Sequence, residues 1–72
     1  MFRSVWPMYE RVLVNLHNGE AIRGLLVKQR RTLLVLTDAE LVHSHSDRPV
    51  PMDGHIYIER PQVAFLQALK GG

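Results

Sequence analysis

The sequence predicts an all-β protein, a small five-stranded and strongly bent antiparallel barrel. Its 72 residues suffice for one domain with a single core. Apolar and polar residues alternate with a period of two in several short segments, as in half-buried strands. An Asn-Gly dipeptide and a glycine inside a strand-like segment indicate a tight hairpin and a bend. Closing such a sheet is an economical way for a short chain to remove exposed strand edges.

The clearest element is the hairpin within "VLVNLHNGEAIRGLL". Residues 12–17 alternate so that one face of the segment is wholly apolar, which predicts the first strand. The chain should reverse at Asn18 and Gly19, because this dipeptide tolerates the positive φ angles of tight turns. Residues 21–27 predict a second strand, and Gly24 within it predicts a sharp bend or a bulge.

A third strand is predicted over residues 32–42, "TLLVLTDAELV". Residues 33–36 could also begin a buried helix, but no helix cap precedes them and we favour a strand. The following segment, "HSHSDRPVPMD" at residues 43–53, contains two prolines that each remove a backbone donor. We expect regular structure to stop there, which makes this segment the longest loop.

The fourth strand is predicted over residues 55–59, "HIYIE", directly after Gly54. Arg60 and Pro61 end it. The last run, residues 62–69, lacks clean alternation, which suits either a strand covered on both faces or a helical turn at its end. We therefore expect residues 1–8 to form an N-terminal arm, residues 9–69 to form the barrel, and residues 70–72 to form a flexible tail.

Composition excludes several classes of protein. The chain has no cysteine, which removes disulfides and thiolate metal sites and leaves oligomerisation as the common way to stabilise so small a domain. We expect neither a signal peptide nor a membrane-spanning segment, because no apolar run is long enough for either. The formal net charge of +2 gives little long-range attraction to a polyanion.

Two parts of the chain resemble the two motifs of the Sm-like (LSm) family. "VLVNLHNGEAIRGLL" followed by "LLVLTDAEL" is similar to the first motif, with individual matches at Gly19, Gly24, Asp38 and Ala39. "GHIYIERPQVAFLQAL" is similar to the second. The resemblance implies an SH3-like or Sm-like barrel that forms rings when the fourth strand of one subunit pairs with the fifth strand of the next.

The chain departs from the family where the family binds RNA. That pocket is formed by an Asp and an Asn between the second and third strands and by Arg-Gly or Lys-His after the fourth. Here the first segment reads "KQRRTL" and the second reads Glu59-Arg60-Pro61, so the resemblance does not carry uridine recognition across. The basic residues either form a solvated turn or contact phosphates. A ring-forming Sm/Hfq-like RNA-binding protein would use Lys28, Arg30, Arg31 and Arg60 for those contacts.

A second resemblance is to short Sm-like proteins from the structural gene regions of actinobacterial tailed bacteriophages. The matching segments are residues 14–26, 33–39, 49–55 and 58–67. The function this implies is a non-enzymatic structural module of a virion, of the minor capsid, decoration or head–tail connector type. Its partners would be itself and other virion proteins. It would lie in the virion, and in the host cytoplasm during assembly; the RNA-binding alternative would be cytoplasmic.

The candidate sites for chemistry are few. His43 and His45 lie on the same side of an extended segment near Asp47, but a zinc site needs three or four converging ligands, and we expect these side chains to be solvated. No nucleophile, base and orienting residue are placed to meet in a cleft. We therefore expect no catalytic residues, no metal, no cofactor and no small-molecule substrate.

Aromatic residues and open edges are the candidate interaction surfaces. Phe2, Trp6 and Tyr9 either plug the open end of the barrel or form an arm that docks on a partner. The fourth and fifth strands carry few charges or prolines to prevent edge pairing, which predicts a homo-oligomer or a partner chain on these edges. The residues expected at this interface are His55, Ile56, Tyr57, Ile58, Val63 and Phe65.

Overall fold

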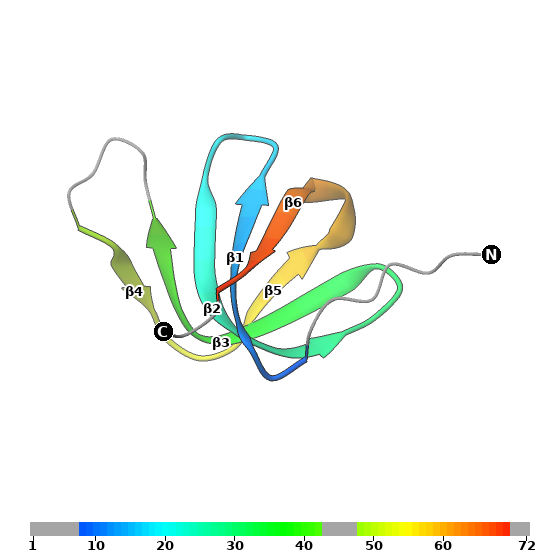
Figure 1. Cartoon of the computed structure of the whole chain (residues 1–72), viewed down its shortest axis with the longest axis horizontal. Helices are drawn as coiled ribbons and strands as arrows, with labels where there is room; N and C mark the ends of the chain where they lie inside the picture. Colours follow the sequence, from blue (N-terminus) through cyan, green and yellow to red (C-terminus); the bar gives the residue numbers. More distant parts are fainter. Residues whose placement is uncertain (1–7, 43–47, 70–72) are drawn as a thin grey trace.

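The computed structural model describes residues 8–42 and 48–69, and every strand pair in this part is antiparallel (Figure 1). The all-β prediction is confirmed. The elements are β1 (Arg11–Leu16), β2 (Ala21–Gln29), β3 (Leu33–Val42), β4 (Val50–Met52), β5 (Ile56–Glu59), the 3₁₀ turn η1 (Arg60–Gln62) and β6 (Val63–Ala68).

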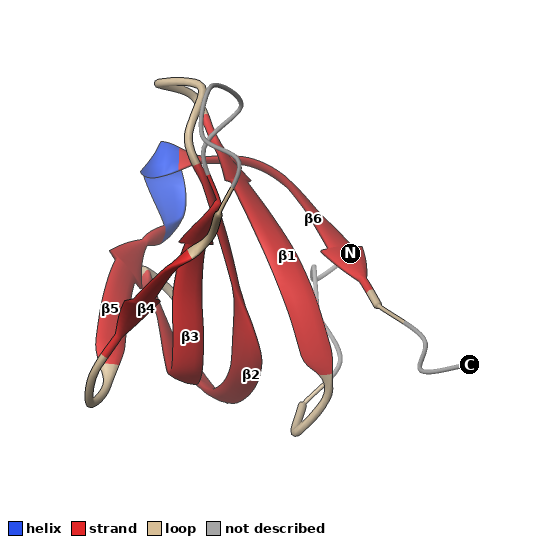
Figure 2. Cartoon of the chain, turned by 90° about the vertical axis from the view of Figure 1, so that its left-hand side faces the viewer, coloured by secondary structure: helices blue, strands red, loops and turns tan. Residues whose placement is uncertain are grey.

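The described strands form one curled sheet in the order β4-β3-β2-β1-β6, with β5 also paired to β3. The long β3 serves two partners: residues 33–36 pair with β5, and residues 39–41 pair with β4. Figure 2 shows β5 and β6 on opposite sides of the molecule, joined through η1 at one end. The strand count therefore exceeds the predicted five, because the second half of the chain contributes two short strands to β3 before β6 begins.

The hairpin between β1 and β2 reverses where the sequence predicted. The N–H of Gly19 donates to the carbonyl of Leu16 at 3.0 Å, and the N–H of Leu16 donates to the carbonyl of Glu20 at 2.8 Å. Gly19 has φ +93°, a left-handed conformation that favours glycine. The side-chain Oδ1 of Asn18 accepts from the N–H of Glu20 at 2.9 Å. The loop is thus a three-residue turn that needs positive φ at Gly19 alone.

Gly24 lies at the predicted bend. The register of β2 against β3 shifts between Arg23 and Leu25 at this point. An added Cβ at Gly24 would lie 2.9 Å from the Cβ of Ala39, and Asp38 on the same stretch of β3 has φ +51°. The bulge therefore combines a buried glycine on β2 with a left-handed residue on β3, and both increase the bend of the sheet.

The core lies between the curled faces of the sheet. Val12 and Val14 of β1 are fully buried, as the alternation in this strand predicted. Met8, which was expected in the N-terminal arm, packs against the core. The buried cluster consists of Val12, Val14, Ile22, Leu26, Leu34, Leu36, Ala39 and Ile58.

The prediction of an irregular segment over residues 43–53 is wrong for its last part. Residues 43–47 lie outside the described residues, but β4 pairs with β3, and the register places Glu40 opposite Pro51. The hydrogen bonds from Leu16 to Glu20 and from Leu26 to Glu10 make every second residue of β2 face β1, which leaves Arg23 to face Glu40 of β3. The Glu40–Pro51 pair is therefore a non-hydrogen-bonded pair of the ladder. The ring nitrogen of Pro51 therefore faces away from β3, where proline removes no bond.

Neither alternative for the last run is correct: residues 63–68 form a strand that is not covered on both faces, and no helical turn follows it at Leu69. In β6 no residue is fully buried, and the strand pairs with β1 alone among the described strands. A register irregularity between Asn15 and Leu16 leaves Ala64 without a directly opposite residue, which explains the interrupted alternation. The strand favoured over a helix for residues 33–36 is confirmed, because these residues belong to β3.

Candidate functional site

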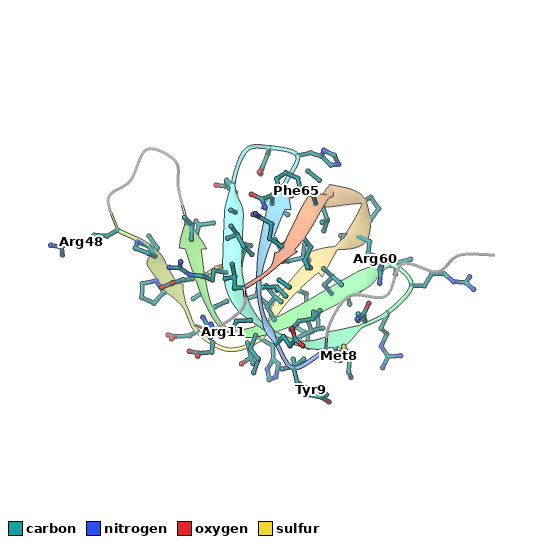
Figure 3. All side chains as sticks on the ribbon, viewed as in Figure 1. Met8, Tyr9, Arg11, Arg48, Arg60 and Phe65 are labelled. Carbon is teal, nitrogen blue, oxygen red and sulfur yellow. The ribbon has the colours of Figure 1, made fainter. Side chains whose placement is uncertain are left out.

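The first candidate site is the end of the molecule where η1 meets the β2–β3 turn. The N–H of Arg60 donates to the carbonyl of Thr32 at 2.9 Å, and its Nε donates to the carbonyl of Arg30 at 2.8 Å. Its Nη2 donates to Oε1 of Gln29 at 3.0 Å. Pro61, whose fixed φ suits the first turn of a helix, follows Arg60 within η1. The fold thus brings Arg60 onto the basic turn from the far side of the sequence (Figure 3).

Three further cations lie on this turn or beside it. Lys28 near the end of β2, and Arg30 and Arg31 in the turn, are all exposed. No ion pair engages any of the three within the part of the chain that the structure describes. All four residues predicted to contact phosphates are therefore gathered at one end of the fold. We refer to Lys28, Arg30, Arg31 and Arg60 as the basic rim.

Glu59 is the acidic exception beside the basic rim. It is exposed at the end of β5, next to Arg60 in the sequence. In the turn itself, positions 29–32 read Gln-Arg-Arg-Thr, without a carboxylate or an Asn amide. The rim can therefore hold an anion such as a phosphate by charge and by guanidinium hydrogen bonds, but it lacks the Asp and Asn of a uridine pocket.

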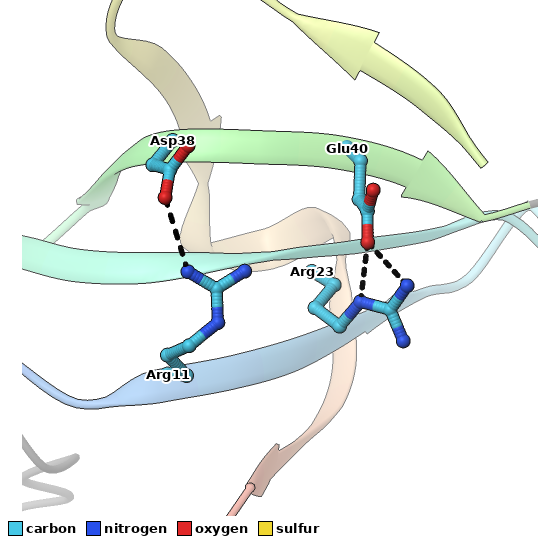
Figure 4. Close-up of polar contacts among 4 residues, drawn as sticks. All are labelled: Arg11, Arg23, Asp38 and Glu40. Carbon is cyan, nitrogen blue, oxygen red and sulfur yellow. Dashed lines mark hydrogen bonds and ion pairs between the residues drawn. The ribbon is translucent and has the colours of Figure 1, made fainter.

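Elsewhere on the surface, arginines are matched by carboxylates, a feature that sequence reasoning missed. Nη1 of Arg11 lies 3.3 Å from Oδ2 of Asp38, and Nε of Arg23 donates to Oε2 of Glu40 at 2.7 Å (Figure 4). Arg23 and Glu40 are directly opposite in the β2–β3 register, which is what brings the second pair together. These two ion pairs neutralise the charges of Arg11 and Arg23, so the net positive charge of the chain comes from residues outside this part of the sheet.

The second candidate site consists of the outer edges of β5 and β6. The hydrogen bond from the N–H of Arg60 to the carbonyl of Thr32 continues the β3–β5 register by one residue, and hydrogen-bonded pairs alternate along antiparallel strands. The backbone N–H and C=O of Tyr57 and Glu59 therefore point away from β3. Tyr57 is also one of the most exposed large apolar side chains, at 65%.

The same reasoning applies to β6. The N–H of Leu69 donates to the carbonyl of Arg11 at 2.9 Å, which continues the β1–β6 register. Alternation then places the N–H and C=O of Leu66 and Ala68 on the edge away from β1. Phe65 lies on the outer face of the strand and is 56% exposed. Both expected edges are thus open in the described chain.

The predicted interface residues do not all lie on the surface. His55 and Tyr57 are exposed, whereas Ile56 and Val63 are half-buried against the core. Ile58 is only 3% exposed, so its side chain belongs to the core of its own subunit. A neighbour could therefore reach Ile58 only along the open side of β5.

Among the other residues singled out in the sequence, Tyr9 lies in the part of the chain that the structure describes. His43, His45 and Asp47 lie outside the described residues, as do Phe2 and Trp6. Tyr9 is described: it is 71% exposed, has φ +58°, and its N–H donates to the carbonyl of Leu26 at 2.6 Å.

The described residues hold neither a metal-binding cluster nor a membrane-spanning helix. Residues 8–42 and 48–69 contain no group of three or more His, Cys, Asp or Glu side chains that could hold a metal ion. In the same residues, no helix has the length and apolar character needed to cross a bilayer.

Comparisons with known proteins bear on the fold. No protein-family model matches the chain. No curated protein matches it either. Among solved structures, the Sm protein of Pyrococcus abyssii in complex with a uridine heptamer is similar, with a TM-score of 0.72, 26% identity and 86% of each chain covered. The P. aerophilum SmAP1 heptamer has a TM-score of 0.77 at 26% identity, over 89% of this chain and 84% of that one.

Two further structures extend this likeness. A heptameric archaeal Sm protein has a TM-score of 0.77 at 25% identity, over 88% of this chain and 90% of that one. A chain of the NatC complex bound to CoA has a TM-score of 0.76 at 19% identity, over 94% and 91% of the two chains, and shows a common fold alone. The resemblance to bacteriophage proteins stays a prediction. The strand order, the bulged bend at Gly24 and these likenesses together establish that the chain has an Sm-like fold.

Proposed function

We propose that this chain is a non-enzymatic, ring-forming Sm-like module that binds single-stranded RNA along the basic rim. The observation that carries the proposal is the position of Arg60, whose guanidinium is hydrogen-bonded onto the β2–β3 turn beside the exposed Arg30 and Arg31. Similar solved structures support it: two are described as heptamers, and one holds a uridine heptamer.

The proposed chemistry is recognition of the RNA backbone. Guanidinium groups bind phosphates by charge and by paired hydrogen bonds, and such contacts carry little sequence information. In a ring, each subunit would contribute one basic rim, so that several weak contacts act on one strand. We therefore expect the affinity for RNA to depend strongly on salt and only modestly on the bases, whereas a pocket shaped for uracil would select that base.

The test is a titration of fluorescently labelled oligouridine with the protein from about 50 to 200 mM salt, a range over which phosphate contacts weaken strongly. The variant Arg30→Gln/Arg31→Gln should lower the affinity at least tenfold at the low-salt end. The slope of log affinity against log salt should fall by at least about 1.4, which is about 0.7 for each lost phosphate contact on a single strand.

The matched control is Arg48→Gln, a change of the same kind in an exposed arginine at the opposite end of the molecule (Figure 3). It should leave both the affinity and the slope close to those of the unmodified protein. Absence of salt-dependent binding by the unmodified protein would refute the RNA proposal. A loss in Arg48→Gln about half as large as that in the double variant would show that the effect follows net charge and not the rim, because the control removes one positive charge and the double variant removes two.

A second candidate function is a structural module of a larger protein assembly, such as a bacteriophage virion. The residues at positions 29–32 and Glu59-Arg60-Pro61 favour it, because they lack the Asp, Asn and Arg-Gly of the family's RNA pocket. In that case the oligomer would form through the same edges but would not bind oligouridine. The protein would then be located in the virion, and in the host cytoplasm during assembly, whereas the RNA-binding protein would be cytoplasmic.

A further inference from the structure

Tyr9 combines two features that are seldom found together, a left-handed backbone and a large exposed side chain. Its φ is +58°, and the residue is 71% exposed. Left-handed φ is uncommon for residues other than glycine, asparagine and aspartate, because Cβ crowds the following carbonyl oxygen. Glycine or asparagine would form the same turn with less strain. The presence of a tyrosine therefore has a cause other than the turn itself.

The strained backbone is held in place by its neighbours in the fold. The N–H of Tyr9 donates to the carbonyl of Leu26 at 2.6 Å, and the N–H of Leu26 donates to the carbonyl of Glu10 at 3.0 Å. Met8, on the other side of Tyr9, packs against the core. The backbone cannot relax without breaking these contacts. Strain that the surrounding structure maintains in this way is typical of functional positions.

The ring of Tyr9 contributes little to the fold. Over residues 8–42 and 48–69, no hydrogen bond, ion pair or ring contact engages its side chain. Tyr9 is also not among the apolar residues that pack against the core. Figure 3 shows its side chain directed away from the ribbon. The ring is therefore free to contact a ligand.

The place of Tyr9 beside β2 indicates the chemistry of that ligand. Lys28 and Arg30 follow Leu26 by two and four positions, so the basic rim begins about 7 Å along the strand from the residue that holds Tyr9. The exposed carboxylate of Glu10 disfavours a phosphate beside the ring, but it does not repel the uncharged face of a base. Cations that follow the backbone and aromatic rings that stack on bases together form the binding sites for single-stranded nucleic acids.

We propose that Tyr9 stacks on an unpaired base of the RNA strand whose phosphates the basic rim holds. This inference rests on the proposed function and deepens it, because it assigns the phosphates and the bases to different residues. Every base has a face on which an aromatic ring can stack, so the contact adds affinity with little base preference. The strained tyrosine is then explained, since a glycine or an asparagine would relieve the turn but remove the ring.

Two variants of Tyr9 form a matched pair for the oligouridine titration. Tyr9→Asn tolerates left-handed φ but has no ring, whereas Tyr9→Phe keeps the ring. Loss of one stacked base lowers affinity by roughly 5- to 150-fold, so Tyr9→Asn should bind at least fivefold more weakly, and Tyr9→Phe should bind like the unmodified protein. The slope of log affinity against log salt should not change in either variant, because stacking releases no counterions. Equal affinities of the two variants would overturn the inference.

An abasic strand of the same length separates stacking from damage to the basic rim. It keeps the phosphates but has no bases, so the unmodified protein and Tyr9→Asn should bind it equally. Weaker binding of Tyr9→Asn to the abasic strand as well, or a lower salt slope, would show that the substitution disturbs the rim and would overturn the inference.

Failure of the proposed function gives a different result. If the unmodified protein shows no salt-dependent binding to either strand, both the RNA proposal and the stacking role of Tyr9 are refuted. If Arg30→Gln/Arg31→Gln lowers the affinity for oligouridine while Tyr9→Asn leaves it unchanged, the stacking role alone is refuted, and the ring of Tyr9 is left as a contact for a protein partner.

Discussion

Gly24 provides the sharpest test of how the barrel bends. The backbone of β2 approaches β3 so closely here that a Cβ at Gly24 would lie 2.9 Å from the Cβ of Ala39 and 3.1 Å from both its Cα and the carbonyl oxygen of Thr37. Two of these three atoms belong to the backbone, so they cannot move aside by a rotamer change. The substitution Gly24→Ala therefore requires the two strands to separate at the bulge.

The expected magnitude is a balance of two terms. Replacing a strand glycine by alanine stabilises by roughly 0.5–1 kcal/mol through the unfolded chain, because alanine has less conformational freedom. Overpacking a close contact costs about 1–3 kcal/mol. We expect Gly24→Ala to destabilise by about 1–2 kcal/mol, which corresponds to a Tm lower by roughly 4–16 °C for a domain of this size. Gly24→Val should be worse, well beyond the roughly 1 kcal/mol that strand propensity spans.

The assay is thermal unfolding followed by circular dichroism at one fixed protein concentration, since subunit association would make Tm depend on concentration. The informative control is the double variant Gly24→Ala/Ala39→Gly, which removes the nearest of the three contacts. It should lose less stability than the two single variants predict when their effects are added, and the coupling isolates the Cβ–Cβ contact. A Gly24→Ala variant that melts like the parent would refute the close-packed bend, as would strictly additive single effects.

Two other glycine-related predictions concern backbone conformation. Gly19→Ala should destabilise by about 1–2 kcal/mol, because alanine is strained at φ +93° even though no atom lies within 4 Å of the added Cβ. Denaturant unfolding would show this loss as a lower midpoint, and an unchanged midpoint would contradict the left-handed turn. Tyr9→Gly should stabilise or be neutral, because an exposed tyrosine at φ +58° stores roughly 1–2 kcal/mol of strain that glycine releases. A marked loss of stability for Tyr9→Gly in the same assay would show that the ring makes a contact on which the fold depends.

Local patterns were sufficient for the hairpin, the bend and most of the strands. Asn18 and Gly19 specify a turn by their own backbone preferences, and the alternation over residues 12–16 specifies which face is buried before any partner is known. Gly24 could be assigned to a bend because a strand interior rarely uses glycine without such a reason. Lys28, Arg30 and Arg31 were visible as a basic cluster because they lie within four residues of one another.

What the tertiary structure alone decided was the pairing of distant strands. Pro51 is compatible with β4 only because the register of β3 turns its nitrogen outward, and the prolines alone had predicted a loop. Arg60 lies on the turn of Arg30, thirty positions away, and Arg23 meets Glu40 across two strands. Periodicity fixes which face of a strand is buried but not which strand lies beside it. The open edges of β5 and β6 and the composition of the basic rim therefore follow from the topology of the sheet, a property of the whole chain.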